Sequence, residues 1–280
     1  MTDHLLDSFL ENAIKEDIGD GDHSSLSCIP KTATGKAQLL IKQDGILAGV
    51  EIAKKVFNKI DESLSFEQFL FDGSEIHQGD RVFIIEGKIH SILQAERLVL
   101  NIIQRMSGIA TTTKTYVNKI SGTRAKVLDT RKTTPGMRYL EKMAVKIGGG
   151  ENHRMGLYDM IMLKDNHIDF AGGIEPAIIK ANDYIKKKNK NINIEIEARN
   201  LNEVKEILRI GKVDRIMLDN FNFDDTREAV RLINSKYETE SSGGITLKTI
   251  RDYAICGVDY ISVGALTHQI KSLDMSLKAI

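Results

Sequence analysis

The sequence lacks a net charge, a cysteine pattern and a long apolar run, and each absence argues against a class of protein. Basic and acidic side chains number 39 each, so we expect no nucleic-acid partner, because surfaces that bind nucleic acid carry a basic excess. Cys28 and Cys256 form no CxxC pair. We therefore expect reduced thiols in a cytoplasmic protein, with a disulfide between them as the less favoured alternative.

No window approaches the ~18 consecutive apolar residues that span a bilayer. The opening stretch MTDHLLDSFLENAIKED also lacks the basic and apolar regions of a signal peptide. We therefore expect no membrane partner. A length of 280 residues suffices for one large domain or two of medium size.

The N-terminal part of the chain has the pattern of a small antiparallel sheet with helices. Helical spacing of apolar residues predicts a helix over 5–16. KAQLLIKQDGILAGVE predicts two strands joined by a tight turn at Asp44-Gly45. SEIHQGDRVFIIEGKI predicts a further strand pair, with turns at 78–80 and 87–88. One long helix then begins near Gln94.

Beyond residue 124, expected strands alternate with expected helices. The strands are Ala125–Asp129, Met160–Leu163, Ile192–Glu197, Arg215–Asp219, Tyr237–Ser241 and Tyr260–Gly264. The helices are Glu175–Lys187, Leu201–Ile210, Asp224–Ser235 and Thr246–Cys256. Repeated βα units imply a parallel sheet, open or closed into a barrel. In a barrel, the carboxyl ends of all strands face one rim, which is where such enzymes keep their active sites.

Charged and glycine-rich segments lie at or just after these strand ends. The cations are Arg131, Lys132, Arg138, His153, Arg154 and Lys164. Their grouping favours an anion pocket over a solvated surface, because Arg grips a carboxylate through two hydrogen bonds and Lys adds a point charge. The sequences SSGGI and SVGALTH follow the last two strands, where barrels tend to bind phosphate.

Acidic residues lie on the same expected rim. Alternation along NINIEIEARN puts Glu195 and Glu197 on one strand face, and Asp219 ends the next strand. Carboxylates there hold a metal, contact a sugar hydroxyl or pair with cations. An internal salt bridge to Lys164 or Arg131 therefore stays open as an alternative. His153 and His167 have no carboxylate at zinc-site spacing, so we expect no zinc site.

The block DTRKTTPGMRYLEKMAVKIGGGENHRMGLYDMIMLKDNH, residues 129–167, strongly resembles the quinolinate phosphoribosyltransferases, which are type II phosphoribosyltransferases also named carboxylating nicotinate-nucleotide pyrophosphorylases. The resemblance continues through EIEARN, IMLDNF, SSGGI, SVGALTH and LDMSL. It also reaches back to EDIGDGDHSS and ERLVLNIIQRMSGIATTT, and so covers most of the chain. Met137, Met143 and Ser241 depart from the family pattern, and Glu197 to Asp219 is one residue longer.

The resemblance implies an α/β fold of two domains. Residues 1–110 would form an α+β sandwich on which the tail 270–280 packs, and residues 111–269 an incomplete parallel α/β barrel. It also implies a homodimer, or a higher oligomer built from it, in which the neighbouring subunit completes the active site. The implied activity is transfer of phosphoribosyl from phosphoribosyl pyrophosphate (PRPP) to quinolinate with decarboxylation. The products would be nicotinate mononucleotide, CO₂ and pyrophosphate, for de novo NAD biosynthesis.

The resemblance also implies roles for individual residues. Quinolinate would be bound by Arg97 of the neighbouring subunit, Arg131, His153, Arg154 and Lys164. PRPP would be bound by Lys132, Glu197, Asp219, Ser242, Gly243, Gly244, Gly264 and His268. The catalytic residues would be Lys132, Lys164, Glu197 and Asp219. Mg²⁺ would be held by Glu197 and Asp219, directly or through water. Which of Glu195 and Glu197 contacts the ligand stays open.

Three other functions fit parts of the pattern. A phosphoribosyltransferase of the same fold could use a ring with one carboxylate, although several cations favour two. A barrel aldolase or isomerase could use Lys132 or Lys164 as a Schiff base, provided that the amine is neutral. A non-catalytic binding protein is disfavoured by the ionisable groups gathered at strand ends.

Overall fold

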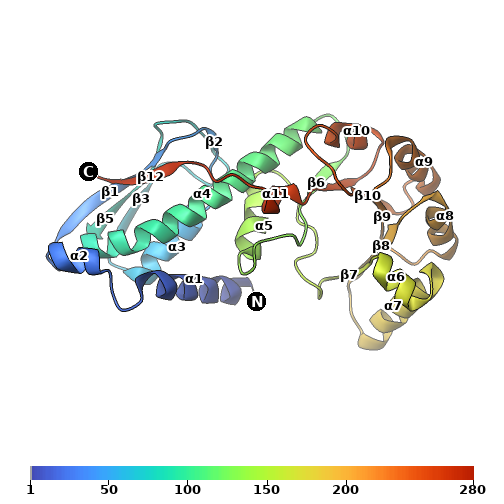
Figure 1. The fold of residues 1–280 in the computed structure, drawn as a ribbon, viewed down its shortest axis with the longest axis horizontal. Helices are drawn as coiled ribbons and strands as arrows, with labels where there is room; N and C mark the ends of the chain where they lie inside the picture. Colours follow the sequence, from blue (N-terminus) through green and yellow to red (C-terminus); the bar gives the residue numbers. More distant parts are fainter. Residues whose placement is uncertain (1) are drawn as a thin grey trace. The chain divides into compact units, whose positions relative to one another are not determined.

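The computed structural model describes residues 2–280 (Figure 1). They divide into two compact units, which we describe separately. Unit 1 comprises the described residues up to Lys114, with Thr133–Gly149 and Leu266–Ile280. Unit 2 comprises Thr115–Lys132 and Gly150–Ala265. The domain boundaries placed after residues 110 and 269 stay a prediction.

Unit 1 is built on an antiparallel sheet of strand order β12-β1-β5-β3. Its strands are β1 (Thr34–Ile41), β3 (Ser65–Gln68), β5 (Arg81–Lys88) and β12 (Met275–Ala279), and a separate pair is formed by β2 (Gly45–Ile46) and β4 (Glu75–Ile76). The helices are α1 (Thr2–Ile18), α2 (His23–Cys28), α3 (Val50–Ile60), α4 (Ile89–Lys119), α5 (Arg138–Ile147) and α11 (Ala265–His268), of which α4 and α11 run across the division into unit 2. β12, at the far end of the chain, pairs with β1 and lies beside it (Figure 1).

Two turn predictions in this unit are wrong. Asp44-Gly45 does not close a hairpin, because both edges of β1 already pair, with β5 and with β12. The Asp44 carboxylate instead accepts a hydrogen bond from the Gln78 backbone N–H at 2.8 Å. Gly87 and Lys88 do not form a turn either, since both continue β5 and pair with β1. The predicted helices over 5–16 and from Gln94 are confirmed within α1 and α4.

Unit 2 is a six-stranded parallel sheet of order β6-β11-β10-β9-β8-β7. Its strands are β6 (Lys126–Leu128), β7 (Met160–Leu163), β8 (Asn193–Ala198), β9 (Arg215–Asp219), β10 (Glu238–Ser242) and β11 (Tyr260–Ser262). All five strand pairs are parallel. Within residues 2–280, the edge strands β6 and β7 do not pair with each other. The sheet is therefore an incomplete barrel, as predicted.

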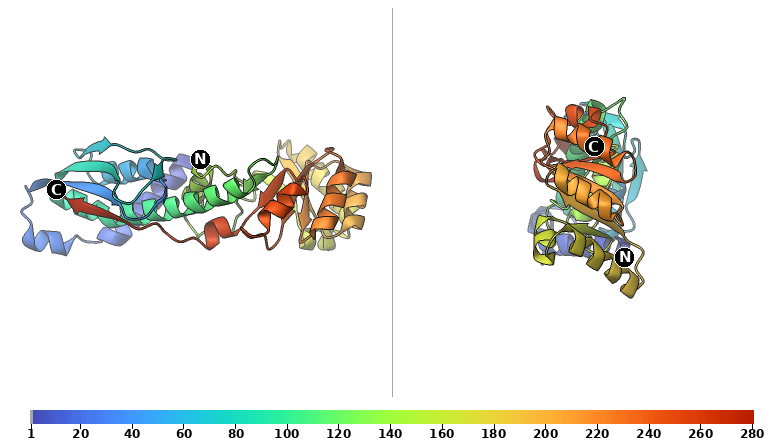
Figure 2. Two further views of the ribbon diagram at one scale, coloured as in Figure 1. Left: turned by 90° about the horizontal axis from the view of Figure 1, so that it is seen from above. Right: turned by 90° about the vertical axis from the view of Figure 1, so that its right-hand side faces the viewer.

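Helices cover the outer face of this sheet (Figures 1 and 2). They are α6 (Asp165–Ala171), α7 (Ile174–Lys188), α8 (Leu201–Ile210), α9 (Phe223–Ile233) and α10 (Ile250–Ile255). The sequence begins α8 sharply after β8, because the Asn200 side chain accepts hydrogen bonds from the N–H groups of Asn202 and Glu203. Apolar Val204 and Ile207 are then buried. In a βα barrel, the turns that follow the strands form the rim on which active sites lie, and the turn between β8 and α8 is one of them.

The six predicted strands and three of the four predicted helices match the structure closely. The fourth helix, predicted over Thr246–Cys256, is shorter, because Thr246–Thr249 form a hydrogen-bonded turn before α10 begins. Cys28 is an exposed free thiol and Cys256 a buried one, as expected. No helix in the described part of the chain has the length and apolar character needed to cross a membrane.

Candidate active site

The carboxyl ends of the unit 2 strands bring the predicted residues of this unit to one edge of the sheet. Asp219 lies opposite Ser242 in the pairing of β9 with β10. Leu163 lies opposite Ile196 in the pairing of β7 with β8, so the next residues, Lys164 and Glu197, are neighbours. Arg131 and Lys132 follow β6, and Gly264 follows β11. The prediction that these strand ends converge is therefore confirmed within unit 2.

Lys164 and Glu197 form the closest charged pair of this edge. The Lys164 Nζ lies 2.5 Å from Glu197 Oε1, and the Asp165 backbone N–H donates to Glu197 Oε2 at 3.1 Å. Glu197 is buried, whereas the Lys164 side chain is 44% exposed. The salt bridge left open as an alternative at Glu197 is thus present. It orients the ammonium group without removing it from the solvent-facing edge.

Asp219 completes an acidic pair with Glu197. Burial, followed by the charge of Glu197, raises the pKa of the Asp219 carboxyl. The Asn220 side-chain amide donates to Asp219 Oδ2 at 2.8 Å and partly offsets this effect. Two carboxylates that repel each other in this way fit a divalent cation, which would relieve the repulsion. They are too few to enclose a metal alone, a feature typical of Mg²⁺ held jointly with substrate phosphates.

The cations Arg131 and Arg154 also lie within electrostatic reach of each other. Burial, followed by the positive charge of Arg131, lowers the pKa of the Arg154 guanidinium. Arg154 Nη1 donates to the Met160 backbone oxygen at 3.1 Å. Arg131 and Lys132 are exposed. Like charges held together at the edge of a sheet form a site that favours an anion.

The loop after β10 contains two glycines with positive φ, Gly243 and Gly244. Gly243 has φ +100°, and a Cβ added there would lie 2.9 Å from the Asn220 backbone nitrogen and closer still to the Asn220 side chain. The Asn220 N–H donates to the Ser242 oxygen at 2.9 Å, which ties this loop to the end of β9. Gly244 also has positive φ, but open space surrounds it. Only glycine therefore fits the close approach at position 243.

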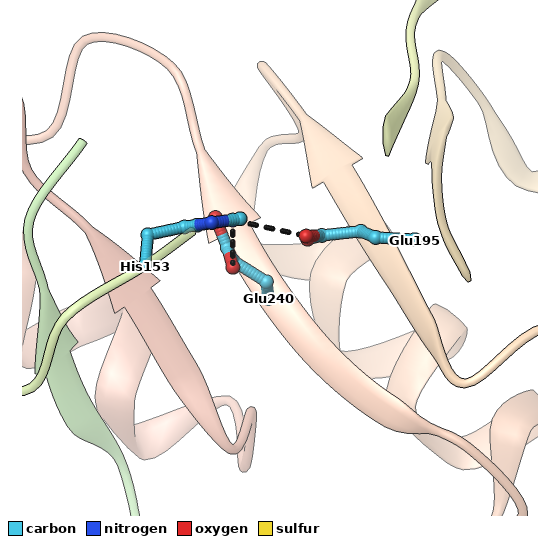
Figure 3. Close-up of side chains that lie close together, drawn as sticks. All are labelled: His153, Glu195 and Glu240. Carbon is cyan, nitrogen blue, oxygen red and sulfur yellow. Dashed lines mark ion pairs between the residues drawn. The ribbon is translucent and has the colours of Figure 1, made fainter. Parts of the chain in front are cut away.

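His153 lies below this edge and not on its surface (Figure 3). Its Nε2 lies 2.9 Å from Glu195 Oε2 and 3.4 Å from Glu240 Oε2. The sequence analysis found no carboxylate at zinc-site spacing from His153, and its two carboxylate partners come from distant strands that such spacing does not reveal. Glu240 and Arg215 were missed altogether. Both are ionisable residues inside strands that were expected to be buried. A buried ionisable residue needs a partner of opposite charge, and this requirement could have identified them.

The buried cluster shifts the pKa values of its members. Burial would lower the pKa of His153, but Glu195 and Glu240 outweigh it and raise that pKa to about 9. Burial and the charge of Glu240 raise the pKa of Glu195 to about 7. Burial opposes ionisation of Glu240, yet His153 and Arg215 lower its pKa. The charge of each group therefore affects the pKa of the others.

Three predicted residues belong to unit 1. Arg97 is exposed on α4, Arg138 begins α5, and His268 is exposed at the end of α11. Arg138 Nε donates to Thr133 Oγ1 at 3.0 Å, so it supports the segment that follows Lys132. The roles of Arg97 and His268 stay predictions.

An incomplete α/β barrel with cationic and acidic side chains at its strand ends defines the class of protein. The family model described as the C-terminal domain of quinolinate phosphoribosyl transferase matches residues 109–278, and the N-terminal domain model matches residues 22–107. The chain therefore belongs to the quinolinate phosphoribosyltransferase family, as the sequence resemblance predicted.

Named relatives agree with this assignment. The chain is 46% identical to the chloroplastic nicotinate-nucleotide pyrophosphorylase [carboxylating] of Arabidopsis thaliana, over 98% of this chain and 82% of the relative. It is 42% identical to the probable nicotinate-nucleotide pyrophosphorylase [carboxylating] of Bacillus subtilis, over 98% and 93% of the two chains. The crystal structure of NadC from Streptococcus pyogenes matches with a TM-score of 0.94 at 38% identity, over 100% of this chain and 99% of that chain.

Proposed function

We propose that this chain is a decarboxylating quinolinate phosphoribosyltransferase of NAD biosynthesis. It transfers the phosphoribosyl group of PRPP to quinolinate and releases CO₂ and pyrophosphate. The observation that carries the proposal is the match of family models to both parts of the chain, together with relatives that align over 98% of it. The cations at the rim of unit 2 support the same conclusion.

Quinolinate is a dianion with adjacent carboxylates, so its site needs several fixed cations. Arg131, Arg154 and Lys164 suit this role, since guanidinium groups bind carboxylates through two parallel hydrogen bonds. The positive charge of Arg131, which lowers the pKa of Arg154 after burial, supports their use as a pair. Arg97 of the neighbouring subunit would add a further cation. His153 belongs to the predicted set as well, and its buried position is treated below.

PRPP would use neighbouring groups of the same rim. Lys132 would neutralise phosphate charge, while the backbone of Ser242, Gly243, Gly244 and Gly264, with His268, would receive the 5′-phosphate. Glu197 and Asp219 would hold the ribose and Mg²⁺, directly or through water. When bound, Mg²⁺ supplies positive charge that stabilises the departing pyrophosphate.

The chemistry requires positioning more than covalent catalysis. The ring nitrogen of quinolinate attacks the anomeric carbon of PRPP, and pyrophosphate leaves with the bonding electron pair. The nitrogen then carries a positive charge next to the carbon that bears the 2-carboxylate. Loss of CO₂ leaves an electron pair on that carbon, which this charge stabilises until a proton is added. The protein's cations hold the ring in line for attack and stabilise charge in a preorganised site.

The pairing of Lys164 argues against the Schiff-base alternative. A Schiff-base lysine must be neutral to attack a carbonyl group. The Lys164 Nζ instead lies 2.5 Å from the buried Glu197 carboxylate, which favours its charged form. We therefore assign Lys164 to anion binding. The cytoplasm as location and the homodimer as working assembly form part of the same proposal.

The test is a steady-state assay with both substrates and with carboxyl-labelled quinolinate. Arg154→Ala and Lys164→Ala should raise the KM for quinolinate about tenfold or more, because each removes a charge-assisted contact, with a much smaller change for PRPP. Arg199→Ala is the matched control, because Arg199 is an exposed cation paired with Glu203 and Asp169. Equal effects on both substrates would contradict the dicarboxylate assignment. Turnover of nicotinate without CO₂ release would identify the single-carboxylate alternative.

A further inference from the structure

Unit 2 contains a buried charged group beneath His153, formed by Glu195, Glu240 and Arg215. Glu195 and Glu240 are 0% exposed and His153 is 7% exposed. The two glutamates extend from β8 and β10 and approach the imidazole from different sides (Figure 3). Burying a charge costs free energy unless the charge is paired, so a group of buried charges needs a structural or functional explanation.

Arg215 places a positive charge next to the Glu240 carboxylate. Its Nη1 donates to Glu240 Oε2 at 3.2 Å, and its guanidinium carbon lies 4.1 Å from the centre of the Tyr260 ring. Glu195 lies opposite Arg215 in the pairing of β8 with β9. The group could be taken for a metal site, since one imidazole and two carboxylates meet there. The guanidinium at Glu240 disfavours that reading, because it already supplies the positive charge that a metal would bring.

The His153 ring is held at both of its nitrogens. Nε2 faces the two carboxylates, and the backbone nitrogen of Arg154 lies 2.6 Å from Nδ1. The His153 backbone N–H donates to Asp129 Oδ1 at 2.9 Å, which ties the same residue to the end of β6. Asp129 itself is fully buried. The ring therefore connects the buried Glu195 and Glu240 carboxylates to the backbone of Arg154.

We propose that Glu195 and Glu240 are positioning residues of the quinolinate site, which orient the His153 imidazole and through it fix the backbone that carries Arg154. The inference rests on the proposed function and deepens it. His153 then acts from beneath as the link between these acids and Arg154, and its two ring nitrogens face protein groups. Arg154 needs such a support, because its guanidinium must stay beside the like charge of Arg131 before any anion is bound.

The test combines kinetics with ¹⁵N NMR of the histidine rings. Glu240→Gln and Glu195→Gln keep the side-chain shape and remove the charge that faces Nε2. Each should shift the His153 ring ¹⁵N signals, raise the KM for quinolinate about tenfold and leave the KM for PRPP within about twofold of wild type. Glu238→Gln is the matched control, since Glu238 binds Arg215 at 2.9 Å but lies on the exposed side. It should change neither the spectrum nor the kinetics.

The outcomes separate this inference from the proposed function. A wild-type enzyme without quinolinate turnover would contradict the function, whereas the ¹⁵N signals of His153 report on the link independently of turnover. Unchanged His153 signals in both glutamine variants would overturn the inference, as would equal KM changes for the two substrates. One metal ion retained per wild-type chain and lost in Glu240→Gln would overturn it as well. If Glu240→Gln does not fold, Glu195→Gln and the conservative Glu240→Asp carry the same test.

Discussion

Gly243 is a residue at which one added methyl group should disturb the loop proposed to bind phosphate. It combines φ +100° with a close approach to the Asn220 backbone nitrogen. Gly243→Ala should therefore displace the loop after β10. The KM for PRPP should rise about tenfold or more, because the displaced loop no longer positions its backbone groups for the phosphate. Steady-state kinetics with PRPP as the varied substrate measure the effect.

Gly122→Ala is the control for this substitution. Gly122 has φ +81°, but nothing lies within 4 Å of an added Cβ. The substitution Gly122→Ala therefore adds backbone strain of about 1 kcal/mol but no steric contact. A similar rise in KM for both variants would mean that strain alone, and not the contact with Asn220, explains the effect.

At the residue scale, sequence reasoning found the groups that face outward from strand ends and missed those that support them from inside. Lys164, Glu197 and Asp219 stand beside recognisable strand ends, so the βα pattern alone brings them together. Glu240 meets His153, and Arg215 meets Glu240, only through the register of three strands. Register depends on side-chain packing between strands, which no local pattern specifies.

At the scale of elements, one buried ion pair joins α4 to α5. Arg105 donates from Nε and Nη2 to Glu141 Oε1 at 2.9 and 2.6 Å, and from Nη2 to Thr134 Oγ1 at 2.7 Å. The Glu141 side chain is only 1% exposed. Arg105→Met should lower the free energy of unfolding by about 3 kcal/mol, because it leaves a buried carboxylate without its cation. Chemical denaturation monitored by circular dichroism measures the change.

The double variant Arg105→Met/Glu141→Met distinguishes charge from packing. It should recover a large part of the stability, because neither charge is then left buried alone. Arg227→Met serves as a control, since the Arg227–Asp224 pair is exposed and contributes little. A double variant as unstable as the sum of both single variants would show that the ion pair itself is not the cause.

Asp61 gives unit 1 a predictable response to acid. Hydrogen bonds from Ser63, first of all its hydroxyl, and from the Ser91 hydroxyl lower the pKa of the Asp61 carboxyl to about 2. A depressed pKa stabilises the fold above the unfolded value of 3.8, and this contribution is lost as pH falls toward about 2. Asp61→Asn should therefore reduce stability by about 1 kcal/mol at neutral pH and flatten its decline between pH 4 and 2.

Thermal unfolding across that pH range measures the slope. Glu62→Gln is the matched control, because Glu62 is an exposed acid one residue further along. A slope in Asp61→Asn as steep as in wild type would place the acid sensitivity elsewhere in the chain.

The elements of unit 2 were easier to predict than those of unit 1 for a physical reason. Parallel βα units pair strands that follow one another along the chain from β7 to β11, so local patterns carry most of the topology. In unit 1, β1 pairs with β12 from the opposite end of the chain. That pairing occupies the edge that an Asp44-Gly45 hairpin would need, so a good local turn signal led to a wrong prediction.

At the scale of the whole molecule, the proposed homodimer makes a prediction about mixed subunits. Arg97→Ala and Lys164→Ala each remove a proposed quinolinate contact, one in unit 1 and one in unit 2. If Arg97 serves the neighbouring subunit, a mixed dimer combines an intact unit 2 of one subunit with an intact Arg97 of the other. At quinolinate concentrations well below the raised KM of either variant, random mixing of the two variants should then restore about a quarter of wild-type activity, because half of the dimers are mixed and each has one complete site.

The same experiment decides whether Arg97 acts within its own subunit. In that case each subunit of a mixed dimer lacks one contact, so mixing restores nothing. The measurement requires unfolding and refolding the two variants together, since subunits that do not exchange would also give no activity. Native mass spectrometry of differently tagged variants shows whether mixed dimers have formed. Mixed dimers without activity would therefore exclude a shared site, and activity near a quarter could arise only from residues contributed across the interface.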